Sequence, residues 1–359
     1  MSVRILLIGA SGHIGAAVLE ALISATLDAK IIAVVRSDDD FDHIVEKYNG
    51  SVETRLISLS DAALLTREAS EAQIAINCAP DVGNSPGIAA LLSSLASDDS
   101  QPNQKFYIHT SGAARTWGPP DPTIPGDKIW DDIADLGNLP TETTHAETDI
   151  QVQQANSETL HTAIVSPCFV IGKSPSRKHR VPITFPDWHH VTRSVGSAWT
   201  IGPGANLTTF VDTVHLAQLY LLLVKDALSV ILSQHSVRNE VWGPEAYYFA
   251  EGIEISIREF TEREVVPALM RNEAAKGWIA KEGNKIKELE LDWVVNSILT
   301  RLGGTEGADL WSRHIAEGFG TSMRIRGSRA REYLGWEAGE GVDLDEAVEA
   351  YVQSLGEGR

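Results

Sequence analysis

The chain has 359 residues, of which 43% are hydrophobic, and a formal net charge of −19 at pH 7. Such a chain can bury a large core, as one big domain or two coupled lobes. A surface this acidic repels phosphate backbones and anionic lipid, which disfavours nucleic-acid or membrane-surface binding. The two cysteines, Cys78 and Cys168, fit a reducing compartment better than a disulfide framework. No apolar run approaches the roughly 20 residues of a membrane span, so we expect a cytoplasmic protein.

Strand-like and helix-like segments alternate through the first half of the chain. The spacing predicts strands over 3–8, 30–35, 52–57, 72–77, 105–110 and 161–166, and helices over 12–26, 61–70, 86–96 and 141–157. This alternation indicates βαβ units. Continuous apolar strands are typical of a sheet that is covered on both faces. We therefore predict an α/β fold, a doubly wound parallel (Rossmann) sheet with a smaller C-terminal substrate lobe.

The alternation of strands and helices stops at Gly172, because residues 172–190 are basic, proline-bearing and irregular. A strand and a helix return over 208–228 and a strand over 246–251, and helices are expected over 256–271, 289–302 and 344–355. We predict a dinucleotide-binding domain over 1–172, to which 206–228 and 244–251 return. Residues 173–205 and 252–359 are predicted to form the substrate lobe.

Residues 5–22, ILLIGASGHIGAAVLEAL, turn an apolar strand into a helix through Gly9, Gly12 and Gly15. A glycine-rich turn there aims backbone N–H groups at an anion, and the helix dipole adds roughly half a positive charge. Gly9 permits the tight turn, Gly12 the approach of a pyrophosphate, and Gly15 close helix packing. No Gly-Lys-Ser/Thr follows, which argues against a P-loop. The other candidate cofactor contacts in this loop are Ser11, His13 and Ile14.

The second strand is followed by Arg36 and then by acidic residues that include Asp38. The adenosine ribose of a dinucleotide lies at this edge of the sheet, where an arginine accommodates the 2′-phosphate of NADP and an acidic residue binds the 2′-hydroxyl of NAD. Arg36 comes first, so we predict NADP as the cofactor. NAD is the alternative, with Asp38 on the ribose.

Nearly end to end, the chain resembles the extended, atypical short-chain dehydrogenase/reductases of the NAD-dependent epimerase/dehydratase type. GASGHIG resembles their cofactor loop, INCAP (76–80) their fourth-strand end, IHTSGAA (108–114) their fifth-strand end, and IVSPCFVIG (164–172) their nicotinamide-contacting segment. The resemblance implies that Ser111 polarises a substrate oxygen. It also implies cofactor contacts at Cys78, Ala79, Pro80, Thr110, Pro167, Phe169 and Val170.

The chain departs from this family at the Tyr-x-x-x-Lys pair, because no tyrosine occurs between Tyr107 and Tyr220. The helix expected over 141–157 carries His145 and Asp149 instead, four residues apart and so on one helical face. Histidine is the commonest general acid or base, and Asp149 is the candidate to orient it. The predicted catalytic residues are therefore Ser111, His145 and Asp149.

These observations predict an NADP(H)-binding oxidoreductase that acts on a small, hydrophobic carbonyl or alcohol metabolite of secondary metabolism. The alternatives are a non-redox acid/base enzyme (isomerase, cyclase or lyase) and a non-catalytic NADP-binding sensor. No metal site is expected, the partner is a small-molecule substrate, and the chain is a monomer or homodimer. The residues expected to line an apolar pocket or pack in the core are Trp117, Trp130, Trp188 and Trp199.

Overall fold

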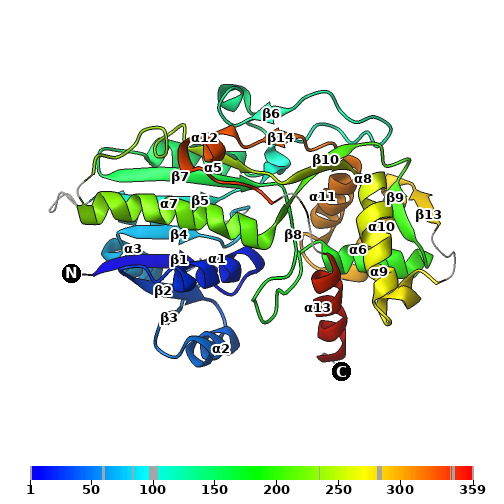
Figure 1. Cartoon of the computed structure of the whole chain (residues 1–359), viewed down its shortest axis with the longest axis horizontal. Helices are drawn as coiled ribbons and strands as arrows, with labels where there is room; N and C mark the ends of the chain where they lie inside the picture. Colours follow the sequence, from blue (N-terminus) through cyan, green and yellow to red (C-terminus); the bar gives the residue numbers. More distant parts are fainter. Residues whose placement is uncertain are drawn as a thin grey trace.

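The computed structural model describes residues 2–58, 61–82, 85–96, 104–233, 235–280, 285–339, 341 and 344–357. Its centre is a seven-stranded parallel sheet in the order β11–β7–β5–β4–β1–β2–β3 (Figure 1). The strands are β1 Val3–Ile8, β2 Ala29–Val35, β3 Glu53–Leu56, β4 Ile74–Asn77, β5 Lys105–Thr110, β7 Leu160–Pro167 and β11 Tyr247–Ala250. The predicted doubly wound α/β fold is confirmed.

Helices cover both faces of this sheet, which is why its strands are continuously apolar. On one face lie α1 (His13–Ser24), α7 (Thr213–Ser233) and α12 (Ser328–Leu334). On the other lie α3 (Ala62–Glu71), α4 (Ser85–Ala96) and α5 (Ala146–Ala155). At the β3 edge, α2 (Asp38–Tyr48) begins in the acidic run. The Ser37 side chain caps it, and its first-turn aspartates complement the helix dipole.

By length and composition, α7 is long and apolar enough to cross a membrane, the one such helix in the described ranges. It lies along the sheet beside α1, and residues such as Leu219, Leu223 and Val224 are completely buried there. A buried core helix passes the same test, so packing against the sheet accounts for its hydropathy.

The second lobe lies beyond the carboxyl ends of the strands (Figure 1). Its strands are paired in two small sheets: β8 (Phe169–Ile171), β10 (Leu207–Asp212) and β12 (Ile253–Ser256) together, and β9 (Ala198–Ile201) with β13 (Ile286–Leu289). A third pair, β6 (Trp130–Asp131) with β14 (Ile325–Arg326), lies beside the main sheet, where β14 contacts β11. The helices of the second lobe are α6 (Phe185–Val195), α8 (Ile257–Phe260), the π turn η3 (Thr261–Val265), α9 (Val266–Arg271), α10 (Leu291–Leu302), α11 (Ala308–Gly320) and α13 (Leu344–Glu357). Short 3-10 turns are η1 (Ala113–Thr116), η2 (Leu136–Asn138) and η4 (Ala275–Trp278).

A buried carboxylate ties the β6 region to the main sheet. Asp132 is fully buried, and its oxygens accept hydrogen bonds from the backbone N–H groups of Phe249 in β11 and Arg329 in α12, both at 2.9 Å. Three segments far apart in sequence therefore meet at one side chain.

We expect Asp132→Ala to destabilise the fold by about 2–4 kcal/mol, because it leaves two buried N–H donors without an acceptor. Asp127→Ala, at an exposed position of the same segment, should change the free energy of unfolding by no more than about 0.5 kcal/mol. Urea denaturation of both variants measures the difference. Equal stabilities would show that Asp132 does not tie these segments together.

Candidate functional site

The carboxyl ends of β1 and β4 lie side by side at the point where the strand order reverses. In doubly wound sheets, ligands bind in the crevice at this position. Gly9 follows β1 with a φ of +77°, and a Cβ added there would lie 2.7 Å from the Ala79 backbone nitrogen. Only glycine fits a backbone approach this close.

The same loop brings α1 against β1. A Cβ on Gly15 would lie 2.1 Å from the Gly9 carbonyl oxygen, whereas one on Gly12 would lie 3.3 Å from it. Gly12 is the N-cap of α1 and has no side-chain cap, so the first-turn N–H groups remain to meet an anion. These residues fit the diphosphate of a dinucleotide, with Ser11, His13 and Ile14 partly exposed beside it.

The other predicted cofactor contacts lie around this crevice. Arg36 is exposed directly after β2, and Ala79 and Pro80 follow β4. Thr110 Oγ1 lies 2.7 Å from the Tyr220 hydroxyl and 3.6 Å from the Cys78 sulfur. Burial raises the pKa of the Cys78 thiol to about 12, so it stays protonated at neutral pH and is a poor nucleophile. Pro167 ends β7, and Phe169 and Val170 form β8.

An imidazole–carboxylate pair lies next to this loop. His145 Nδ1 is 2.7 Å and 2.9 Å from the two carboxylate oxygens of Asp81, and Thr148 Oγ1 donates to Asp81 at 2.8 Å. Burial opposes ionisation of Asp81, but the imidazoles of His109 and His145 outweigh it and hold the pKa of Asp81 well below its usual range. Asp81 therefore fixes the proton of His145 on Nδ1, which leaves Nε2 to take up or release a second proton.

The predicted pairing of His145 with Asp149 on one helical face is wrong. The helix begins at Ala146, and His145 is its N-cap with a left-handed backbone (φ 72°). The 141–157 prediction thus began too early. A non-glycine residue in this conformation costs about 1–3 kcal/mol and is enriched at functional sites. Here it turns the imidazole towards Asp81, with Nε2 lying against Gly112.

Asp149 has a different set of partners. Its Oδ2 accepts hydrogen bonds from Arg115 Nη1 at 2.9 Å and from the Tyr247 hydroxyl at 3.0 Å, and the carboxylate is fully buried. Burial and the charge of Asp149 raise the pKa of Tyr247. Ser111, also buried, lies near this phenol and influences its pKa. The sequence-predicted Ser111 and Asp149 are thus brought together around Tyr247, while His145 pairs with Asp81.

Two buried groups extend the pair into the core. His109 Nε2 lies 3.8 Å from Asp81 Oδ2, and His109 Nδ1 lies 3.1 Å from the Tyr107 hydroxyl. Tyr107, His109, Asp81 and His145 therefore form a line of polar groups from β5 to the crevice. Sequence reasoning missed Asp81 and His109. The available signals were a carboxylate four residues after a strand end and a histidine inside an apolar strand.

The second lobe supplies another missed residue, His314 on α11. Its ring stacks on Trp117 with centroids 4.8 Å apart, and burial, together with the charge of His145, lowers its pKa. Trp117 also lies 6.4 Å from the Phe169 ring. A Cβ on Gly318 would lie 2.9 Å from Trp117 and 3.0 Å from Phe169, so glycine lets both rings approach α11.

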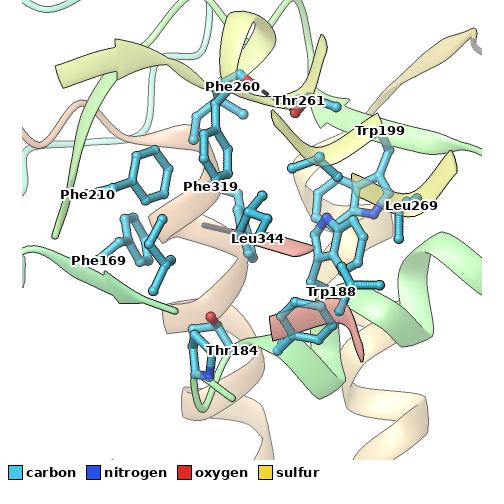
Figure 2. A pocket seen from close by; sticks show the side chains of 16 residues that line it. Phe169, Thr184, Trp188, Trp199, Phe210, Phe260, Thr261, Leu269, Phe319 and Leu344 are labelled. Atoms are coloured by element: carbon cyan, nitrogen blue, oxygen red, sulfur yellow. Dashed lines mark hydrogen bonds between the residues drawn. The ribbon is translucent and has the colours of Figure 1, made fainter. Parts of the chain in front are cut away.

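An apolar cavity of about 80 Å³ lies in the second lobe. Figure 2 shows Phe169 and Phe210 on one side of it and Trp188 and Trp199 on the other. The sequence expectation of a tryptophan-lined pocket holds for Trp188 and Trp199. Trp117 is not part of the cavity wall but packs beside Phe169, which is. Trp130 lies in β6, which pairs with β14. Phe169 belongs to both the cavity wall and the aromatic contacts that lead to His314.

Within the described residues, no group of three or more His, Cys, Asp or Glu side chains is arranged to hold a metal ion. The features that the site does contain are a dinucleotide-binding loop, an imidazole–carboxylate pair and an apolar cavity.

Comparison with known proteins agrees with the geometry of the crevice. A family model described as the saccharopine dehydrogenase NADP binding domain matches residues 5–94. The chain is 24% identical over 377 residues to a protein named Oxidase ucsJ from Acremonium sp, covering 99% of each chain.

Solved structures resemble the chain over nearly its whole length. A UDP-glucose 4-epimerase from Thermotoga maritima has a TM-score of 0.62 at 15% identity, covering 98% of this chain and 99% of the epimerase. A dTDP-glucose 4,6-dehydratase from Bacillus anthracis, solved with NAD, has a TM-score of 0.59 at 12% identity, covering 98% and 97%. The terminal R domain of the myxalamid biosynthetic pathway has a TM-score of 0.63 at 15% identity, covering 99% and 91%. The predicted resemblance to the epimerase/dehydratase fold is confirmed, and an NADP-binding domain is present.

Gly15→Ala should destabilise the protein by about 1–3 kcal/mol, because the added methyl group meets backbone atoms that cannot move independently. Gly12→Ala is the matched control, since its methyl group meets only the Gly9 oxygen at 3.3 Å. We expect Gly12→Ala to keep most of its stability and to bind NADPH more weakly. Thermal unfolding and calorimetric titration separate the two effects. Equal destabilisation by both substitutions would contradict this account.

Asp81 should make stability fall in acid. Its folded-state pKa is depressed, so its contacts contribute stability that is present above about pH 4 and lost as the pH falls below that value. Asp81→Asn should flatten the fall in Tm between about pH 4 and pH 2, whereas Asp42→Asn, at an exposed position, should not. If the Tm of Asp81→Asn falls in acid as steeply as that of the wild type, Asp81 is not the source of this pH dependence.

Proposed function

Starting from an NADP-binding domain in an epimerase-like fold, we propose that the protein is an NADP(H)-dependent oxidoreductase of a hydrophobic carbonyl or alcohol. The observation that carries the proposal is the 2.7 Å contact between His145 Nδ1 and the Asp81 carboxylate. Asp81 follows the end of β4 by four residues, and the same segment lies against Gly9 of the glycine-rich loop. NADPH, when bound, supplies a hydride. The loop residues Gly9, Gly12 and Gly15 would hold its diphosphate.

In this proposal, His145 replaces the family's tyrosine as the proton donor. Its Nε2 gives a proton to the substrate oxygen during reduction and takes one during oxidation. Asp81, held ionised by its neighbours, orients the ring and stabilises the imidazolium form. The buried imidazole of His109, whose Nε2 lies 3.8 Å from Asp81 Oδ2, is the second group that helps to keep this carboxylate ionised.

The aromatic cavity supports a hydrophobic substrate. Its walls are phenylalanine, tryptophan and aliphatic side chains, with Thr184 and Thr261 among the few polar residues. Such a surface binds a small, flat apolar group better than the sugar nucleotides named in the epimerase-type structures. This favours a metabolite of secondary metabolism. A cytoplasmic location fits the two free cysteines.

His145→Gln should lower turnover by about 10²–10⁴-fold, because the substitution removes the proton donor, while NADPH affinity stays unchanged. The assay follows loss of NADPH absorbance with a panel of aromatic and polycyclic ketones and aldehydes. His235→Gln, at an exposed position, is the control.

Three outcomes would contradict the proposal. Wild-type turnover that persists in His145→Gln would exclude the named proton donor. Substrate conversion without a change in the redox state of the cofactor would indicate an isomerase, cyclase or lyase. Tight NADPH binding without turnover of any compound would favour a sensor.

A further inference from the structure

Residues 173–180, here called the basic strap, leave β8 and lie across the glycine-rich loop. Ser176 Oγ donates to the Ser11 carbonyl at 2.6 Å, and Ser174 Oγ donates to the His13 carbonyl at 2.7 Å. Both strap serines are buried. The strap is therefore anchored to the backbone of the loop that holds the diphosphate, although Ser174 lies 161 positions after His13 in the chain.

His13 provides a third anchor. Its Nδ1 lies 3.0 Å from the carbonyl oxygen of His179 in the strap, and its Nε2 lies 3.0 Å from Thr213 Oγ1 at the start of α7. Burial lowers the pKa of His13, so the ring is neutral at pH 7 and Nδ1–H donates to the carbonyl. These contacts fix the position of the two residues between Ser176 and His179.

Those two residues are Arg177 and Lys178, and they lie at the end of β2. Arg177 Nη1 is 2.8 Å from Asp39 Oδ1, and Lys178 Nζ is 2.9 Å from Asp39 Oδ2 and 3.3 Å from Asp40 Oδ1. Arg36 lies near the same place, because it precedes Ser37, whose hydroxyl oxygen is 3.4 Å from Lys178 Nζ, and its charge contributes to lowering the pKa of His179. Three cations from two distant segments thus converge where a parallel dinucleotide fold places the adenosine ribose.

We propose that Arg177 and Lys178, carried by the basic strap, join Arg36 in binding the 2′-phosphate of NADP. The Arg177, Lys178 and Asp39 side chains are each about half exposed, so solvent weakens their ion pairs. A 2′-phosphate carries more charge than a carboxylate and accepts hydrogen bonds through three oxygens. It displaces Asp39 from the two cations, which need only rotate their side chains.

This inference rests on the NADP-binding domain and not on the catalytic role of His145. The test is therefore a binding measurement that needs no substrate. Adenosine 2′,5′-bisphosphate carries the 2′-phosphate, and AMP does not, so the ratio of their Kd values reports recognition of that phosphate alone. Calorimetric titration measures both ligands with the wild type and with variants.

Arg177→Gln/Lys178→Gln should weaken binding of the bisphosphate by about tenfold or more and leave the Kd of AMP unchanged. Lys173→Gln is the matched control, because Lys173 lies in the same strap but faces Glu346 at 3.9 Å; it should behave as the wild type. Asp39→Asn should tighten binding of the bisphosphate several-fold, since it removes the negative charge that both cations share.

Two results would overturn the proposal. If the double variant keeps the wild-type ratio, Arg36 alone reads the phosphate. If the double variant loses affinity for AMP and the bisphosphate equally, the strap only supports the loop. Neither result bears on turnover, so the proposed oxidoreductase activity is tested separately.

Discussion

The chain leaves β1 through Gly9 so close to Ala79 that even a methyl group would meet the neighbouring backbone. Asn77 Oδ1, at the end of β4, accepts a hydrogen bond from the Ala79 N–H at 3.2 Å and turns the chain there. This contact places Asp81 beside the glycine-rich loop. The carboxylate that orients the candidate proton donor is therefore fixed by the same backbone junction that makes room for a diphosphate.

Both lobes contribute residues to this site. The sheet supplies the loop, Asp81 and His109, whereas the second lobe supplies the aromatic cavity and His314. Phe169 contacts both parts, since it lines the cavity and packs beside Trp117. Because β8 leaves the main sheet to pair with β10, the segment after β7 can reach this position between the lobes.

Much of the fold was predictable because strands buried on both faces leave a strong apolar pattern, and the glycine spacing marks the first strand–helix junction. The start of α5 was not. The sequence around His145 is compatible with a helix, and only the tertiary contact with Asp81 explains the left-handed backbone. Asp81 and the contact of the basic strap with Asp39 were missed for a related reason: partners that lie 64 or 138 residues apart leave no local pattern.

The buried partners of Asp149 limit which residues could replace it. Replacing it by the lysine of a Tyr-x-x-x-Lys pair would set a new ammonium group against the buried Arg115 guanidinium and leave the Tyr247 hydroxyl without its acceptor. A tyrosine in place of His145 would meet an unfavourable left-handed backbone and lack the ring nitrogen that Asp81 binds. Each replacement alone would therefore be destabilising, and a tyrosine–lysine pair at these positions would need the partners Asp81, Arg115 and Tyr247 to change as well.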